Sequence, residues 1–306
     1  MKKAGLFYND IFLRHATPAG HPECPERLLA IAKAVRESEI NGMLAHHRPR
    51  RAGPKEIEAV HDPEYVRRMS AFTGYFDSDT YISPGSYEAA LFAAGAVIEA
   101  LRGIKEGGIE RAFCAVRPPG HHAERDRAMG FCIFNNVAVG ARAAQALGFK
   151  RVFIVDFDVH HGNGTQHIFY EDPSVFYFST HQYPFYPGTG AASEQGAGAG
   201  AGTTRNVPMA AGSGEKQYLE VYRGILPPLM ARFKPDIVLV SAGYDIYKGD
   251  PLAAINVSVE GIRGISEGIL AAAGAAPSVF VLEGGYDLTA LGNLVVITLE
   301  RLLNFE

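Results

Sequence analysis

Short apolar segments alternate with longer segments of helical periodicity along most of the chain. Each short segment is apolar on both faces, which is typical of a buried parallel strand. The predicted strands are Ala4–Tyr8, Ala112–Val116, Arg151–Phe157, Val175–Thr180, Ile237–Ala242 and Val279–Leu282. The longer segments carry Ala, Leu, Ile and Glu at helical spacing. The predicted crossover helices are Ser86–Glu106, Asn135–Leu147, Glu215–Phe233, Val259–Ala273 and Leu288–Leu303.

This alternation predicts an α/β fold with a central, mostly parallel sheet that helices flank on both faces. One such domain can reach 306 residues, so we expect a single domain over residues 1–306. The Gly- and Ala-rich segment 188–202 could be a linker between two domains, but strand and helix units continue after it. This continuation favours a surface loop.

The composition is that of a soluble globular protein, with 47% hydrophobic and 20% charged residues. A formal net charge of -4 and the short basic stretch Arg48–Arg51 predict no nucleic-acid partner. No window approaches the roughly 18 to 20 apolar residues of a membrane helix, and Met1–Tyr8 is too short for a signal-peptide core. Three cysteines without CxxC spacing fit a reducing compartment, so we expect a cytoplasmic protein.

The strongest motif is DFDVHHGNG at 156–164, which follows a predicted strand. Ligands of an α/β sheet bind beyond the carboxyl ends of its strands. Side chains two apart on a strand point the same way, so Asp158 and His160 can present a carboxylate and an imidazole to one metal ion. Asp245, directly after another strand, can supply a third ligand. For each residue alone, a helix cap or a turn is the alternative.

Two further polar motifs follow predicted strands. The sequence RPPGHHA at 117–123 places His121 and His122 at one strand end. The sequence EGGY at 283–286 places Tyr286 at another, where paired glycines permit close backbone approach. The sequence therefore predicts that four strand ends converge on one site.

These four motifs, with HPE at 21–23 and GFCIFNN at 130–136, resemble the histone deacetylase superfamily over roughly residues 5–300. The resemblance is nearest to its class II and bacterial amidohydrolase branches. It implies an arginase/deacetylase-like fold and hydrolysis of the amide of acyl-lysine or of a similar acylated amine. It also implies one Zn²⁺ per chain and a structural K⁺. The implied zinc ligands are Asp158, His160 and Asp245. The implied potassium ligands are Asp156, Asp158, His160, Ser179 and Thr180.

By resemblance, His121 and His122 serve as general base and acid, and Tyr286 hydrogen-bonds to the carbonyl oxygen as negative charge develops there. Asp156 is expected to orient His121. Asn163 would orient His122 without raising its pKa as a carboxylate would. Because two carboxylates cancel the formal charge of Zn²⁺, the ion should acidify water less than one held by three imidazoles, and a strong base is needed.

The resemblance places five residues around the substrate: Gly130, Phe131, Tyr186, Leu252 and Asp79. Tyr186 stands where Phe is commoner, which makes the channel more polar. Leu252 stands where polyamine-specific relatives carry an acidic residue, which favours a neutral or peptide-like substrate. Asp79 could hold the substrate backbone or lie in a solvated turn.

Three alternatives remain open. An acetylpolyamine amidohydrolase would share the chemistry. An arginase-type hydrolase with two manganese ions needs an Asp at the position of Gly243. A non-catalytic reader of acyl-lysine would keep the fold but lose the chemistry, whereas here the motif residues are retained. The sequence leaves open the natural substrate, zinc versus iron, and a possible homo-oligomer.

Overall fold

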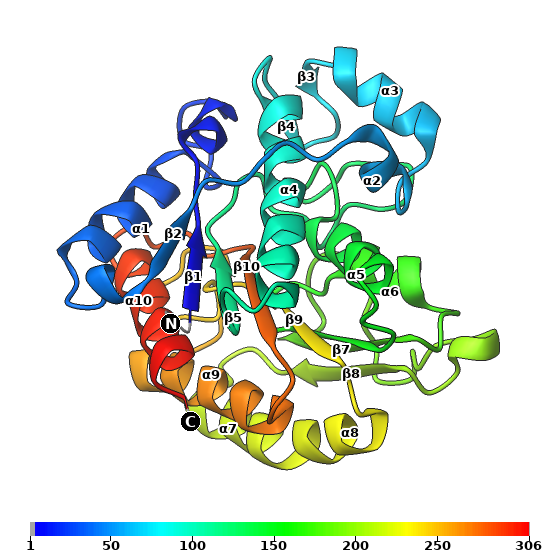
Figure 1. Ribbon diagram of the computed structural model, residues 1–306, viewed down its shortest axis with the longest axis vertical. Coiled ribbons are helices and arrows are strands. Elements are labelled where there is room, and N and C mark those ends of the chain that lie inside the picture. The colour runs from blue at the N-terminus through cyan, green and yellow to red at the C-terminus, as the bar shows by residue number, and fades with distance from the viewer. Residues whose placement is uncertain (1–3, 306) are drawn as a thin grey trace.

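The computed structural model describes residues 4–305, and within them eight parallel strands form one central sheet (Figure 1). In order across the sheet the strands are β2 (Ala45–His47), β1 (Ala4–Phe7), β5 (Arg111–Cys114), β10 (Ser278–Leu282), β9 (Ile237–Ala242), β6 (Val152–Asp156), β7 (Val175–Gln182) and β8 (Thr204–Met209). A separate antiparallel pair consists of β3 (Gly74–Tyr75) and β4 (Tyr81–Ile82). Met1–Lys3 and Glu306 lie outside the described residues. The predicted domain over residues 1–306 includes all four of them, and the segment Met1–Tyr8 includes the first three.

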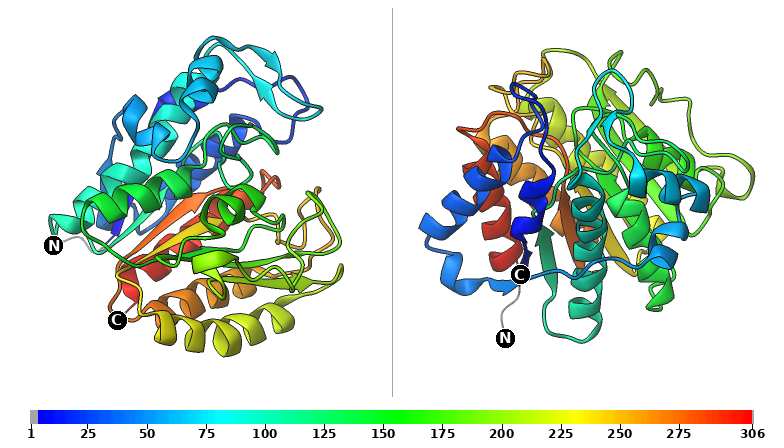
Figure 2. Two further views of the ribbon diagram at one scale, coloured as in Figure 1. Left: turned by 90° about the vertical axis from the view of Figure 1, so that its right-hand side faces the viewer. Right: turned by 90° about the horizontal axis from the view of Figure 1, so that it is seen from above.

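Helices cover both faces of this sheet (Figure 2). One face carries α4 (Ser86–Lys105), α5 (Asn136–Ala146) and α6 (Asn163–Phe169). The other carries α1 (Glu26–Glu37), α7 (Glu215–Glu220), α8 (Leu226–Phe233), α9 (Val259–Ala273) and α10 (Leu291–Asn304). The short helices are α2 (Pro54–Glu58), α3 (Pro63–Ala71) and the 3₁₀ turns Asp10–Arg14, Asn41–Met43 and Gly198–Gly200. The predicted α/β class, with a parallel sheet between helices, is confirmed.

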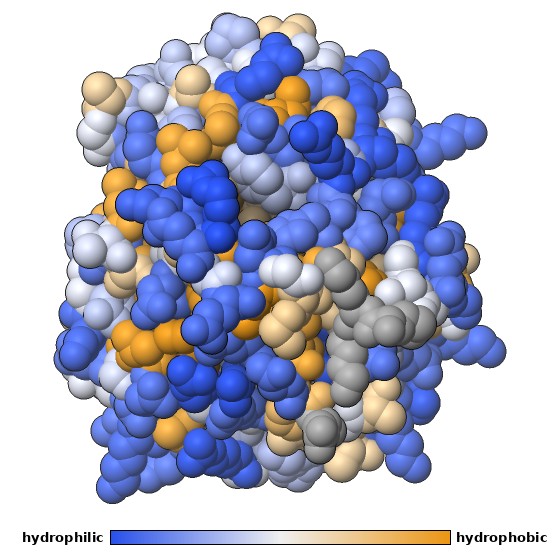
Figure 3. Space-filling view, turned by 60° about the vertical axis from the view of Figure 1, so that its left-hand side comes forward, coloured by the Kyte–Doolittle hydropathy of each residue, from blue (hydrophilic) through white to orange (hydrophobic). Residues whose placement is uncertain are grey.

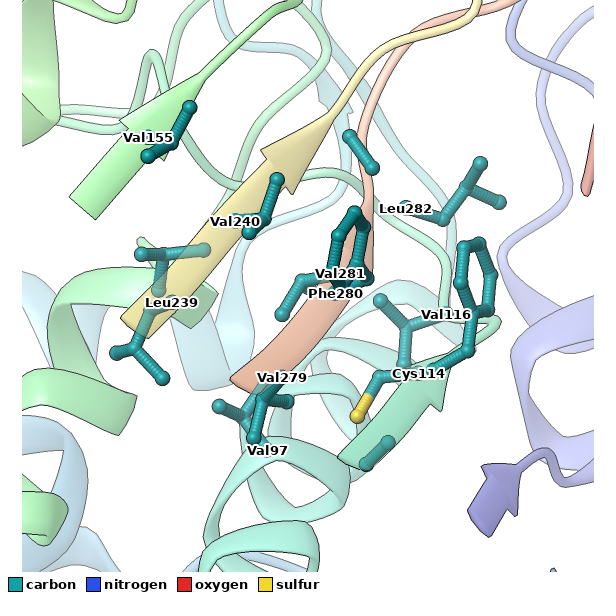
Figure 4. Packing of buried hydrophobic residues seen from close by; sticks show 14 of the residues in the cluster. Val97, Cys114, Val116, Val155, Leu239, Val240, Val279, Phe280, Val281 and Leu282 are labelled. Carbon is teal, nitrogen blue, oxygen red and sulfur yellow. The ribbon is translucent and has the colours of Figure 1, made fainter. Parts of the chain in front are cut away.

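The core lies where the central strands meet α4. Leu239 and Val279 pair in register on the neighbouring strands β9 and β10 and are fully buried, and Val97 of α4, also fully buried, lies on the same face of the sheet (Figure 4). Burying one such side chain stabilises the fold by roughly 1.5–3 kcal/mol. Because helices cover both faces, nearly every position of β6, β9 and β10 is apolar, and the core holds the carboxyl ends of these strands in fixed positions.

One predicted helix is interrupted. The segment expected as a single helix, Glu215–Phe233, is helical throughout but contains a π-helical turn at Val221–Ile225. Pro227 and Pro228 follow at once, and they lack the backbone N–H that an α-helix needs. The π turn therefore stands where regular hydrogen bonding meets the prolines.

The Gly- and Ala-rich segment 188–202 connects β7 to β8, two strands that pair within the same sheet. It is therefore a loop of the sheet domain, as predicted, and not a linker between domains.

The visible surface in Figure 3 is mainly hydrophilic, and its hydrophobic areas are interrupted by polar side chains. Among residues 4–305, no helix combines the length and the apolar character that crossing a membrane requires.

The buried His61 predicts a loss of stability in acid. Its Nδ1 lies 2.9 Å from the carbonyl oxygen of Glu124, and its Nε2 accepts from the backbone N–H of Asn135 at 2.9 Å. Burial lowers the pKa of His61 to about 4, against 6.5 for an exposed imidazole. Between these values the unfolded chain binds more protons than the folded one, so the free energy of unfolding falls as the pH falls.

We expect His61→Gln to flatten the pH dependence of urea unfolding between pH 7 and 4. The full effect of His61 is on the order of 3 kcal/mol. An unchanged slope in the variant would show that His61 does not titrate in this way.

Candidate functional site

The predicted motifs follow four adjacent strands of the sheet. These strands are β5, β10, β9 and β6, and all run parallel. Because parallel strands in register end at one edge of a sheet, the loops that follow them meet there. The structure thus brings the four motifs together.

Asp158, His160 and Asp245 form a group whose candidate ligand atoms all lie within 4.8 Å of one another. His160 Nδ1 lies 3.2 Å from Asp158 Oδ1 and 3.3 Å from Asp245 Oδ2. Both carboxylates are buried. Two carboxylate oxygens and one imidazole nitrogen are a ligand set that suits a divalent metal ion such as zinc.

One carboxylate oxygen of Asp245 lies near His160 but accepts no hydrogen bond within residues 4–305, which supports this assignment. Asp245 Oδ1 accepts from the N–H of Val159 at 2.9 Å, whereas the buried Oδ2 accepts no hydrogen bond from any described residue. Burial and the neighbouring charge of Asp158 raise the pKa of Asp245 to about 7. A bound cation would satisfy the free oxygen and remove the repulsion. Asp245 is not a helix cap, because the next helix, α9, begins only at Val259.

Two glycines make room for the carboxylates. A Cβ on Gly284 would lie 2.0 Å from Asp245 Oδ2, and a Cβ on Gly243 would lie 2.1 Å from Asp158 Oδ2. The N–H of Gly284 also donates to Asp158 Oδ2 at 2.8 Å. At position 243, any side chain would collide with Asp158, including the aspartate that a binuclear site needs there.

The rings of His121 and His122 lie side by side, but each ring is hydrogen-bonded to a different side chain. Their ring centroids are 4.0 Å apart. His121 Nδ1 lies 3.1 Å from Asp156 Oδ2, whereas His122 Nδ1 lies 2.8 Å from the amide oxygen of Asn163. Burial alone would lower the pKa of His121, but the charges of Asp156 and Asp158 raise it to about 10. Burial and the His121 charge lower the pKa of His122, so the pair combines a charged and a neutral ring.

Asp156 is held in place by its surroundings. The hydroxyl of Tyr177 donates to Asp156 Oδ2 at 3.1 Å, and a Cβ on Gly162 would lie 2.3 Å from that oxygen. Gly162 also stands at the N-cap of α6, and no side chain of the described residues caps this helix. The alternative that Asp156 or Asp158 caps the following helix is therefore wrong.

Tyr286 closes the site from the β10 side. Its ring is 9% exposed, faces Phe131 edge-on at 6.0 Å, and lies 4.9 Å from the guanidinium carbon of Arg27. Its backbone N–H donates to Asp250 Oδ2 at 2.6 Å. Burial raises the pKa of the phenol well above its ordinary value, so the hydroxyl remains a hydrogen-bond donor.

The histidine pair, His160 and Tyr286 face one cavity of about 150 Å³. It is lined by Asp79, Pro119, His121, His122, Gly130, Phe131, His160, Tyr186, Leu252, Gly284 and Tyr286. The five residues predicted to surround a substrate are thus together with the histidines and the phenol. Gly130 fits only as glycine, since its φ is 56° and a Cβ would lie 2.4 Å from His122 Cδ2.

Not all side chains predicted to bind potassium lie on the same face of the sheet. Ser179 pairs in register with Asp156, and its hydroxyl bonds to His181 Nδ1 at 2.8 Å. Thr180 follows it on β7, so its side chain points to the opposite face of the sheet, where it bonds to the hydroxyl of Tyr222 at 2.8 Å. Thr180 could reach such a site only through its backbone carbonyl group.

Sequence reasoning gave no role to two residues that shape the site. Glu283 accepts from the backbone N–H groups of Gly120 and His121 at 2.6 and 3.2 Å and so fixes the loop of the histidine pair. Arg27 donates to the carbonyl oxygens of Glu283 and Gly285. Glu283 belongs to the EGGY motif, but Arg27 lies in a helix that the periodicity did not reveal.

Comparisons with known proteins agree with these observations. A model of the histone deacetylase domain matches residues 21–302. Histone deacetylase 15 of Arabidopsis thaliana is 40% identical over 292 residues, which are 92% of this chain and 53% of the plant protein. The chain thus spans about half of that relative.

A probable deacetylase of Archaeoglobus fulgidus is 38% identical over 295 residues, which are 93% of this chain and 81% of the archaeal protein. The crystal structure of the HDA15 HD domain superposes with a TM-score of 0.95 at 38% identity, over 98% of this chain and 88% of that one. The predicted arginase/deacetylase-like fold is confirmed.

We expect Gly284→Ala to reduce the metal bound per chain, because the added methyl group would displace both carboxylates. Gly224→Ala is the matched control, since nothing lies within 4 Å of the point where its added Cβ would stand. Metal content after dialysis and the thermal shift on adding Zn²⁺ measure the effect. Full metal content in Gly284→Ala would contradict the assignment.

Proposed function

The chain belongs to the histone deacetylase family, and we propose that it is a zinc-dependent deacetylase that hydrolyses the amide of acyl-lysine or of a similar acylated amine. The observation that carries this proposal is one cavity that is lined by the histidine pair, a buried phenol and His160, the imidazole of the three-residue metal-ligand group. Each of these parts has a separate task in amide hydrolysis.

The metal would be held by Asp158, His160 and Asp245, one ion per chain. When bound, Zn²⁺ supplies Lewis-acid activation of water and of the substrate carbonyl group. We also propose a structural K⁺ beside it, with Asp156 and the hydroxyl of Ser179 among its ligands. Asp158, His160 and Thr180 would reach that ion through their backbone carbonyl oxygens.

His122 is the group suited to accept the proton of the attacking water. Its Nδ1 faces an amide oxygen, and burial beside the charged His121 keeps the ring neutral. His121 is paired with Asp156 and stays charged, which suits it to stabilise negative charge and to give a proton to the departing amine. Because Asp156 and Asn163 differ in charge, the two adjacent imidazole rings would carry out different proton transfers.

Tyr286 completes the site as a neutral hydrogen-bond donor to the carbonyl oxygen. Arg27 and Phe131 fix its ring, so the hydroxyl is oriented before the substrate binds. A preorganised donor to developing negative charge contributes about 3 kcal/mol to catalysis.

The cavity favours a slender, uncharged substrate stem. Phe131 and Tyr186 line it with aromatic rings, and Leu252 supplies an apolar side chain at its rim. Asp79 also lines the cavity and could accept a hydrogen bond from the backbone of a bound peptide. These features support an acylated lysine peptide or a small acylated amine as the substrate. An acetylpolyamine amidohydrolase remains the alternative, although Leu252 gives no negative charge to select a polyamine.

Tyr286→Phe and His122→Ala should each reduce kcat on an acetyl-lysine peptide by roughly 10²-fold or more, because each removes a group used in the transition state. Bound metal should stay at the wild-type level, since neither residue belongs to the ligand group. Turnover and metal content are measured on the same preparations. Wild-type turnover in both variants would refute the mechanism.

We expect the wild-type protein to hydrolyse acetyl-lysine peptides with a higher kcat/KM than acetylputrescine or acetylspermidine. Leu252→Glu should shift this ratio toward the polyamines roughly fivefold, the effect of about 1 kcal/mol from a partly exposed charge pair. Leu252→Gln, which adds a polar group without charge, controls for size. A wild-type preference for polyamines would reverse the proposed substrate ranking.

A further inference from the structure

We propose that Glu124 is a positioning residue that fixes the amide of Asn163 and, through it, the tautomer of His122. The inference rests on the proposed function, in which His122 accepts a proton. Glu124 follows the histidine pair in the chain, and its side chain lies behind Asn163 with 15% of its area exposed. It does not line the cavity, so it would act through its neighbours.

The amide of Asn163 bridges His122 and Glu124. Its Oδ1 lies 2.8 Å from His122 Nδ1, while its Nδ2 donates to Glu124 Oε1. A carboxylate can only accept hydrogen bonds, so only the NH₂ end of an amide can face it. Turned by half a rotation, Asn163 would direct its oxygen at the carboxylate and leave a buried repulsive contact.

This orientation determines which nitrogen of His122 carries the proton. An amide oxygen only accepts, so a neutral His122 must be protonated at Nδ1 and carry its lone pair at Nε2. A lone pair at Nε2 is what a base that acts from this ring requires. If the amide turned, its NH₂ group would face Nδ1 and favour the opposite tautomer, which has no lone pair at Nε2.

The other contacts of the NH₂ group are too weak to fix the amide. Asn163 Nδ2 lies 3.4 Å from the carbonyl oxygen of His122 and 3.4 Å from the sulfur of Met129. The contact to the carbonyl oxygen is longer than a strong hydrogen bond, and sulfur is a weak acceptor. The charged carboxylate of Glu124 is the dominant acceptor at this end of the amide.

Glu124 itself is held from two sides. His167 lies four residues after Asn163 on α6, so the two side chains share one face of the helix, and His167 Nδ1 lies 2.8 Å from Glu124 Oε1. The backbone carbonyl of Glu124 is bonded to the buried His61. Burial alone would raise the pKa of Glu124, but the His167 and Asn163 bonds lower it, which keeps the carboxylate charged.

The direct test is nitrogen NMR of the metal-loaded protein labelled with ¹⁵N-histidine, in which the two neutral tautomers give different correlation patterns. Wild type should show His122 protonated at Nδ1. In Glu124→Leu, we expect a mixture or the Nε2 tautomer, with kcat on an acetyl-lysine peptide roughly 10- to 100-fold lower and KM nearly unchanged. Glu124→Gln keeps an oxygen that can face Asn163, so it should retain the wild-type tautomer and most activity.

Glu260→Gln is the control for loss of a negative charge, because Glu260 lies on the distant α9 and pairs with Arg263 at the surface. A wild-type tautomer and wild-type kcat in Glu124→Leu would overturn the proposal. A changed tautomer with unchanged kcat would uphold the positioning role and instead refute His122 as the base.

A second comparison does not require a stable Glu124→Leu protein. In the single variant Asn163→Asp, the new carboxylate would face the carboxylate of Glu124 and be repelled by it. When Glu124→Gln is added, this repulsion is absent. The double variant should therefore be more active than Asn163→Asp alone. Additive losses of activity would overturn the direct coupling between the two side chains.

Discussion

The structure depends on two carboxylates buried next to each other, those of Asp158 and Asp245. Two negative charges withdrawn from water repel each other strongly, and such a pair persists only where positive charge or hydrogen-bond donors compensate it. Here His160 faces both carboxylates and backbone N–H groups contact each, yet one oxygen of Asp245 is left without a hydrogen bond by the described residues. A metal ion at this point would explain the pair, the glycines around it and the convergence of four strand ends.

The histidine pair extends the same electrostatic argument. A carboxylate behind one ring and an amide behind the other give two adjacent imidazoles opposite preferences for a proton. Because the rings are 4.0 Å apart, the charge on His121 itself helps to keep His122 neutral. In the proposed mechanism, the choice of one partner side chain would separate the tasks of acid and base, and Glu124 would act behind that partner.

The central part of the fold was predictable because it is buried on both faces. Ile237–Ala242 was predicted with the observed ends, since helices cover the strand and every position except Ser241 is apolar. The edge strands β2 and β8 were missed: β2 is short, and β8 carries Arg205 and Pro208, which an edge tolerates but which break the apolar pattern. The convergence of the candidate metal ligands and the histidine pair could be predicted because motifs that follow parallel strands meet at one edge of the sheet. The proposed role of Glu124 could not be predicted, because a carboxylate in a loop belongs to no periodic pattern. Its contacts with Asn163 and His167 exist only once the chain is folded.

Anomalous diffraction from crystals of the zinc-loaded protein, collected on both sides of the zinc absorption edge, shows whether one zinc ion lies between Asp158 and Asp245. We expect a single zinc peak per chain, within bonding distance of Asp158, His160 and Asp245. Absence of a zinc peak between these side chains, or a second zinc peak in the same chain, would contradict a single zinc site.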